Sequence, residues 1–200
     1  MILLKSNAHS IYWLARYLTR IQQLCAHLPF EQDQHAHAFA QGFGLDIDDA
    51  ASLNALIQNS VQSLSLKQQL QQVQANLQDL RGVLSAKVYA ELNQLVRAAS
   101  QQLVTICRAI SHCISLLEAE SPEVWTFFAL GQQLELLDWQ IRLQQPTVQH
   151  IHKLAQWLDA LDVMGWHMIN AAWHDFKKQP ELIQLYALTQ QLQIEFEAAA

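Results

Sequence analysis

Residues 6–28, SNAHSIYWLARYLTRIQQLCAHL, contain the pattern that decides the fold. Large apolar side chains recur along this stretch in alternating steps of about three and four, the spacing of one face of an α-helix. Ser6 or Asn7 can cap the start of this helix, and Pro29 ends it. The stretch therefore predicts an amphipathic helix with one face in a protein core. The residues of that face are Ile11, Leu14, Leu18, Ile21, Cys25 and Leu28.

Further helix starts follow, each marked by a capping residue or a proline before an apolar stripe. They are Asp48 or Asp49, Ser65, Ser85, Ser121, Thr147 and Pro180. Residues 30–46 lack a clear period and are predicted as a loop or a short irregular helix. The stripe of residues 88–117 forms one helix, or two with a break near 98–100, and the stripe after Thr147 runs to Ala172. We therefore predict an all-α fold, a single-domain bundle (1–200) of about seven helices with short loops.

The most regular repeat lies in residues 66–84, where leucine or valine follows a heptad pattern between glutamines. This repeat is only about three heptads long, and its outer face has few charges to select a partner helix. We therefore favour a helix of the bundle over an extended coiled coil.

The composition is sufficient for one core and argues against several kinds of function. Apolar residues make up 51% of the 200 positions, which is enough for a sizeable core, and only 5 glycines and 4 prolines interrupt it. The net charge of -6 and the absence of a basic stripe argue against nucleic-acid binding. The first apolar run is too short for a signal peptide, and no run approaches the roughly 18 residues of a membrane span. A soluble, cytoplasmic chain without a membrane partner is expected.

Three cysteines, Cys25, Cys107 and Cys113, form an odd set without C-x-x-C spacing. This pattern predicts neither a disulfide framework nor a zinc site. Each cysteine lies on an apolar stripe, so we expect all three to be small core residues.

Three ordered blocks of the sequence resemble the alpha-E family of bacterial helical domains. Residues 8–20, AHSIYWLARYLTR, are similar to the family's opening A-E-N-x-Y-W-x-G-R-Y-x-E-R. Residues 76–93, NLQDLRGVLSAKVYAELN, resemble its second block, with Tyr89 in place of a tryptophan. Residues 128–142, FALGQQLELLDWQIR, are similar to L-G-R-x-L-E-R-A-D-x-x-x-R. The resemblance implies a helical domain with two signature helices, at about 7–28 and 122–145.

The sequence departs from the family pattern at the Glu-Arg pair that gives the family its name. The first copy has Thr19 before Arg20, and the second has Glu135 before Leu136, so each copy has lost one member. Gln132 also replaces an arginine, and the chain is shorter than members with a further helical half. The chain resembles a trimmed, divergent member, or one half of a split pair.

The polar residues of the two signature helices form the candidate site. Glu135, Asp138 and Arg142 lie on one helix face, because steps of three and four bring residues together. Arg16 and Arg20 are also four apart. We predict that the two helices pack together, with these arginines paired to Glu135 or Asp138 beneath a cover of two aromatic side chains. The cover consists of Tyr12 and Trp13.

Two interpretations of this cluster remain open. Buried arginine–carboxylate networks can fix one arrangement of a bundle, which would make the cluster a structural clamp. Alternatively, the arginines receive a carboxylate or phosphate from a ligand, which would make it an anion pocket. No residue is assigned a catalytic role, because no phosphate loop, G-x-S-x-G elbow or H-E-x-x-H motif is present.

The nine histidines do not form a recognisable metal site. No Glu-x-x-His motif of a di-iron bundle is present, and the pairs at 35/37 and 150/152 point to different helix faces. His167 and His174 could share a face, but no second helix offers further ligands. We predict no metal and no cofactor. Five tryptophans of the second half are equally compatible with a core and with an interface: Trp125, Trp139, Trp157, Trp166 and Trp173.

The family resemblance implies a protein partner. Alpha-E domains are associated with circularly permuted ATP-grasp proteins in operons proposed to form peptide or amide linkages. By that analogy this chain is a non-catalytic partner or scaffold of such a ligase. The alternatives are a stand-alone enzyme or anion-binding protein that uses the arginine–carboxylate cluster, and a plain homo-oligomeric bundle.

Overall fold

The computed structural model describes residues 3–59, 62–101, 105–166 and 171–197, and every regular element in these ranges is an α-helix. The all-α class predicted from the sequence is confirmed. The ten helices are α1 (Lys5–His27), α2 (Asp33–Gly42), α3 (Ala50–Asn59), α4 (Leu66–Asp79), α5 (Ala86–Gln101), α6 (Ile106–Glu118), α7 (Pro122–Arg142), α8 (Val148–Val163), α9 (Ala171–Lys178) and α10 (Leu182–Glu197).

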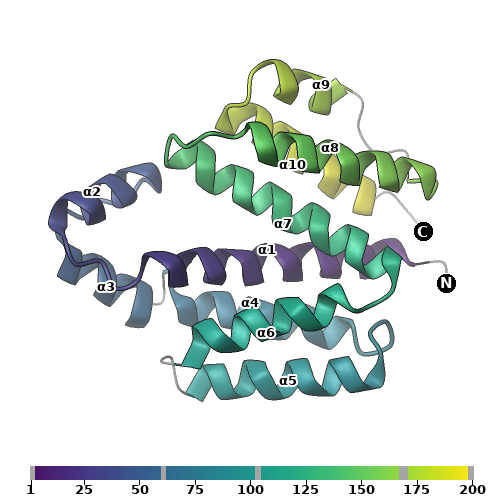
Figure 1. The fold of residues 1–200 in the computed structure, drawn as a ribbon, viewed down its shortest axis with the longest axis horizontal. Helices are drawn as coiled ribbons and strands as arrows, with labels where there is room; N and C mark the ends of the chain where they lie inside the picture. The colour runs from purple at the N-terminus through teal and green to yellow at the C-terminus, as the bar shows by residue number, and fades with distance from the viewer. Residues whose placement is uncertain (1–2, 60–61, 102–104, 167–170, 198–200) are drawn as a thin grey trace.

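Helix α1 runs through the middle of the bundle and has different neighbours on its two sides (Figure 1). On one side it packs against α4 and α6, and α5 lies beyond these two helices. On the other side α7 crosses it, and α8 and α10 pack against α7. Helices α2 and α3 form a pair near the C-terminal end of α1. The first signature helix is therefore the central element of the fold.

The prediction of about seven helices was too low, because one additional helix forms and two predicted helices are divided. Helix α2 lies within residues 30–46, where Ala36, Phe39 and Ala40 are buried at helical spacing between polar residues. The 88–117 stripe is two helices, because α5 ends at Gln101, close to the predicted break, and α6 begins at Ile106.

The stripe predicted from Thr147 to Ala172 is interrupted at Gly165. The φ angle of this glycine is 86°, in the left-handed region that glycine adopts without strain. Helix α8 therefore ends at Val163 and α9 is a separate helix. Met168, which was predicted to belong to this stripe, lies outside the described residues.

The predicted helix caps are largely confirmed, and they explain why the helices begin where they do. Asp49 Oδ1 accepts a hydrogen bond from Ser52 N at 2.8 Å, and this bonding lowers the pKa of Asp49. Ser65, Ser85 and Ser121 each accept a bond from the backbone N–H three residues later, at 3.3–3.4 Å. There are two exceptions. Thr147 lies at the N-cap of α8 but its side chain makes no capping hydrogen bond. Helix α1 starts at Lys5 and has Leu4 at its N-cap, before the predicted caps Ser6 and Asn7.

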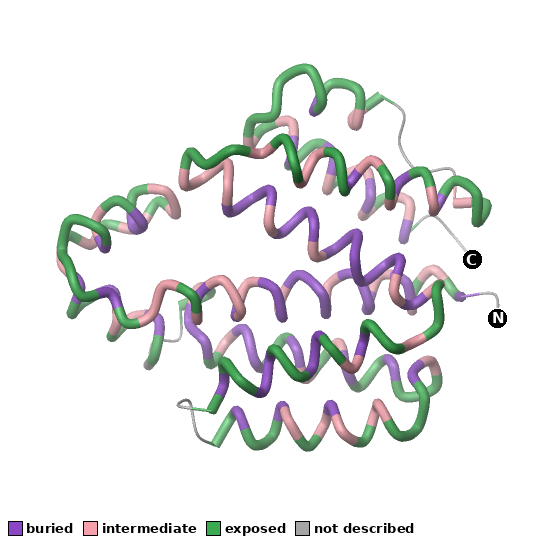
Figure 2. Tube along the Cα trace, in the orientation of Figure 1, coloured by how far each residue is buried: buried purple, intermediate pink, exposed green. Residues whose placement is uncertain are grey.

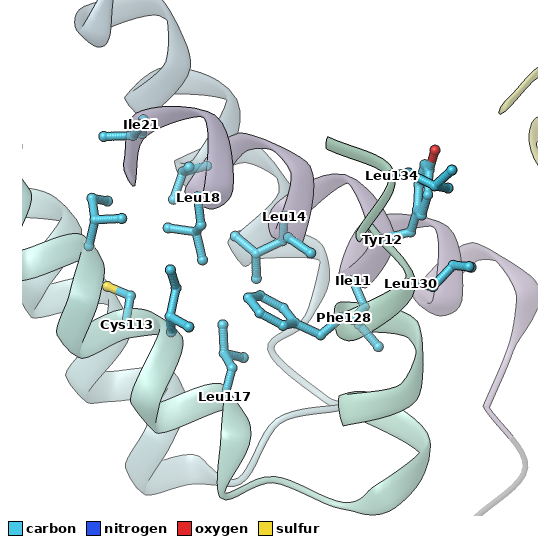
Figure 3. Close-up of a cluster of buried hydrophobic side chains, with 14 of the residues drawn as sticks. Ile11, Tyr12, Leu14, Leu18, Ile21, Cys113, Leu117, Phe128, Leu130 and Leu134 are labelled. Carbon is cyan, nitrogen blue, oxygen red and sulfur yellow. The ribbon is translucent and has the colours of Figure 1, made fainter. Parts of the chain in front are cut away.

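The core follows α1 and α7, which are the most continuously buried helices in Figure 2. Figure 3 shows Leu14 and Leu18 on the side of α1 that faces Cys113 and Leu117, whereas Tyr12 lies beside Leu134. The apolar stripe of α4 packs against α1, as expected for a bundle helix. Within the described residues, no helix is long and apolar enough to cross a membrane.

The expectation of three unlinked cysteines is wrong for two of them. Cys25 and Cys107 form a disulfide, which joins the end of α1 to the start of α6. The two residues are 82 positions apart in sequence, but packing of α1 on α6 brings their Cα atoms to 5.6 Å. Cys113 is a free, buried core residue as predicted, and burial raises the pKa of its thiol to about 12.

Candidate functional site

The candidate site starts from a close backbone contact between α1 and α7. A β-carbon at Gly131 would lie 2.3 Å from the carbonyl oxygen of Tyr12 and 3.0 Å from Cβ of Ala15. Real side chains do not tolerate such distances, so only glycine permits this approach. The crossing at Gly131 places the polar residues of the next turn of α7 directly against those of α1.

Glu135 is the centre of the polar contact and is fully buried. Arg16 Nε donates to its Oε2 at 3.0 Å. Arg20 donates twice, from Nε to Oε1 at 2.5 Å and from Nη2 to Oε2 at 2.9 Å. Trp139 Nε1 donates to Oε1 at 3.2 Å. Both carboxylate oxygens are therefore occupied by donors, two of them from the fork of Arg20.

The electrostatics of this group favour the charged forms. Burial alone would raise the pKa of Glu135, but Arg20 and Arg16 outweigh it and hold that pKa below its usual value. Burial alone would lower the pKa of Arg20, but the Glu135 carboxylate reverses the effect, and the pKa is raised. The site is therefore a buried carboxylate that holds two guanidinium groups.

Aromatic side chains cover the arginines, as the sequence predicted. The Tyr12 hydroxyl accepts a bond from Arg16 Nη1 at 3.1 Å, and burial raises the pKa of this phenol. The Cζ atom of Arg16 lies 5.1 Å from the centre of the Trp13 ring, and Cζ of Arg20 lies 5.7 Å from that of Tyr17. Tyr17 was not among the predicted site residues.

Asp138 and Arg142 form a second ion pair one turn further along α7. Arg142 Nε donates to Asp138 Oδ2 at 2.8 Å within the same helix. Asp138 is therefore paired with Arg142, whereas both arginines of α1 bond Glu135. Arg142 also donates to the carbonyl oxygen of Gly42 and to the Tyr186 hydroxyl, which ties α2 and α10 to the end of α7.

The two incomplete Glu-Arg copies complete each other across the helix crossing. The first copy keeps Arg20, the second keeps Glu135, and these two side chains form the shortest ion pair of the cluster. Thr19, at the position of the lost glutamate, is fully buried, and its hydroxyl has no hydrogen-bond partner among the described residues. Leu136, at the position of the lost arginine, is half-buried. One Glu-Arg pair therefore remains, formed between two copies.

The structure brings together all seven sequence-predicted residues, but their role in ligand binding stays a prediction. It also adds residues that sequence reasoning missed. Trp139 was recognisable, because it lies one helical turn after Glu135. The sequence gives no indication that the Gly42 carbonyl and Tyr186 meet Arg142, because they come from α2 and α10.

A cavity of about 840 Å³ lies between the end of α1, helix α2 and the loop after α7, and of the predicted residues only Arg142 lines it. Across the described ranges, no group of three or more His, Cys, Asp or Glu is placed to hold a metal ion. Of the five clustered tryptophans, Trp139 is buried and the other four are half-buried.

Comparison with known families gives one match. A family model described as a predicted alpha-helical domain with a conserved ER motif matches residues 3–176. The matched range contains the three sequence blocks and both members of the Glu135–Arg20 pair, whereas α10 lies beyond it. Neither the curated proteins nor the solved structures contain a match.

Proposed function

The chain belongs to the Alpha-E family, and from this premise we propose that it is a non-catalytic helical partner of a circularly permuted ATP-grasp ligase that forms peptide or amide bonds. The ligase partner is inferred from the family resemblance. The non-catalytic role is inferred from the chain's own side chains.

The observation that supports a non-catalytic role is the saturation of Glu135. A general base must have a lone pair directed at a substrate proton. Both oxygens of Glu135 instead accept bonds from Arg16, Arg20 and Trp139, and its lowered pKa makes it a weaker base. This carboxylate therefore joins α1 to α7 and is not free to act as a base.

Helix α10 supplies the surface that we assign to the ligase contact. Its inner face is buried through Leu185, Leu188 and Leu192. Its outer face exposes Ile183 by 70% and Ile194 by 49%, large apolar side chains that a partner could cover.

Co-expression with a circularly permuted ATP-grasp protein tests the proposal. We expect the two proteins to co-purify, ligase activity to fall when this chain is omitted, and the chain alone to hydrolyse no ATP. The double variant Ile183→Asp/Ile194→Asp should weaken co-purification, because it places charges on the outer face of α10 without altering the core.

The matched control is Gln71→Asp/Gln78→Asp, which adds the same charge at exposed positions of α4 and should leave co-purification unchanged. Failure of the two proteins to associate, with ligase activity unaffected by this chain, would contradict the proposal and favour a homo-oligomeric bundle. ATP hydrolysis by the purified chain would favour the stand-alone enzyme.

A further inference from the structure

The polar cluster carries an unbalanced positive charge. Its cations are Arg16, Arg20 and Arg142, and its anions are Glu135 and Asp138, so three positive charges face two negative ones and the net charge is +1. Only part of this charge is in contact with solvent, because the exposed fraction of the Arg20 side chain is 22% and that of Arg142 is 20%. A partly buried cation of this kind is stabilised by a counter-anion.

A pocket of about 210 Å³ opens beside the unbalanced charge. Arg20 and Arg142 line it together with Asp138. Among the described residues that line this pocket, Asp138 is the only acid, and one of its oxygens already accepts a bond from Arg142. The pocket is therefore electropositive and contains a single acidic side chain.

The remaining walls favour a small ligand that is polar at one end. Phe43, Leu45 and Leu64 form apolar walls, which reduce screening by water and strengthen a charge–charge contact inside the pocket. Ser63 lies at the exposed rim. A volume of about 210 Å³ has room for a group of a few heavy atoms.

Arg20 offers hydrogen-bond donors that the protein does not use. Its Nε and Nη2 donate to Glu135. Its Nη1 has no hydrogen-bond partner among the described residues. This nitrogen is also not fully buried, so solvent can reach it. Its two N–H groups are therefore available to an acceptor that reaches the arginine from solvent.

We propose that the pocket between Arg20 and Arg142 binds one carboxylate group, either of a small free acid or of a peptide C-terminus. A carboxylate has a single negative charge, so it balances the net +1 of the cluster. A phosphate dianion would instead leave an excess negative charge beside Asp138 and the apolar walls. The proposal concerns this pocket alone and does not depend on a ligase partner.

Titrations at constant ionic strength, followed by the NMR signals of the arginine Nε–H groups, test the carboxylate site. Sodium acetate should shift the Arg20 signal in a saturable manner, and sodium chloride or phosphate should not. N-acetylglycine, which mimics a peptide C-terminus, distinguishes the two sources. Binding about tenfold tighter than that of acetate assigns the site to a chain end, and equal binding assigns it to a small free acid.

Two tryptophan variants supply the control. Ser63→Trp fills the exposed rim of the pocket and should weaken acetate binding by about tenfold or more. Ser111→Trp adds the same side chain at an exposed position of α6, away from the pocket, and should bind acetate like the unmodified protein. The proposal is wrong if acetate shifts the Arg20 signal no more than chloride does, if phosphate binds more tightly than acetate, or if Ser63→Trp binds acetate normally.

Discussion

On the side of α1 that faces α4 and α6, Leu14 and Leu18 lie among apolar side chains such as Val73 and Cys113. On the side that faces α7, by contrast, Arg16 and Arg20 meet a buried carboxylate. The apolar contact is non-directional, so several similar packings would bury almost the same area. The polar contact has directional hydrogen bonds and a high cost if they are not formed, so it selects one arrangement. We infer that the apolar side contributes most of the stability and that the polar side fixes the register of α7 on α1.

The largest expected effect is that of removing the buried carboxylate. Glu135→Ala should lower the free energy of unfolding by about 3–5 kcal/mol, because it leaves two arginines without their counter-charge in the interior. Chemical denaturation followed by circular dichroism measures this change. A loss below about 1 kcal/mol, the value of a surface ion pair, would show that the contact is not a clamp.

The corresponding change on the apolar side is Leu18→Ala. It should cost about 2–5 kcal/mol, from lost burial and from the cavity that remains. The two sides of α1 can be distinguished more clearly if the two variants differ in structure as well as in stability. We expect the tryptophan fluorescence of folded Leu18→Ala to match that of the unmodified protein. In Glu135→Ala the emission should change, because Trp139 loses its acceptor.

Acidification should weaken only the polar contact between α1 and α7. Its effect on the free energy of unfolding should be smaller than that of Glu135→Ala. The pKa of Glu135 is lower in the folded protein than its usual value, so its contribution to stability is complete above the unfolded pKa. That contribution is lost as the pH falls through the folded pKa. The stability advantage of the unmodified protein over Glu135→Gln should therefore be large at pH 7 and should shrink at strongly acidic pH. An advantage independent of pH would contradict an ionised Glu135.

The smallest expected effect has the opposite sign. Thr19→Val should stabilise the protein by about 1 kcal/mol, because it removes a buried hydroxyl that has no partner among the described residues and keeps nearly the same shape. Thermal unfolding measures the gain. If Thr19→Val is destabilising by a similar amount, the hydroxyl has a role in the fold that its surroundings do not indicate.

The sequence could predict those features of the fold and the site that have a local signal. The stripe of α1 and the caps at Ser65, Ser85 and Ser121 are local signals, and they predicted the helices well. The Glu-Arg remnants predicted the contact between Arg16, Arg20 and Glu135, because each remnant lies on a matched helix face.

Contacts between distant elements had no local signal. The Cys25–Cys107 disulfide depends on the packing of α1 against α6, which neither cysteine indicates. The bonds of Arg142 to α2 and α10 were missed for the same reason. The segment of α2 was predicted as a loop or a short irregular helix, because polar residues separate its short apolar face.

Arg20 and Glu135, the surviving halves of two Glu-Arg copies, form one partly buried pair that joins α1 to α7. A double-mutant cycle of Arg20→Met and Glu135→Gln measures their coupling directly, with Arg142→Met and Glu135→Gln as the control cycle, because Arg142 bonds Asp138 instead. We predict a coupling free energy of about 1–3 kcal/mol for the first cycle and near-additivity for the control. Additive effects in the first cycle, within about 0.5 kcal/mol, would contradict the pairing.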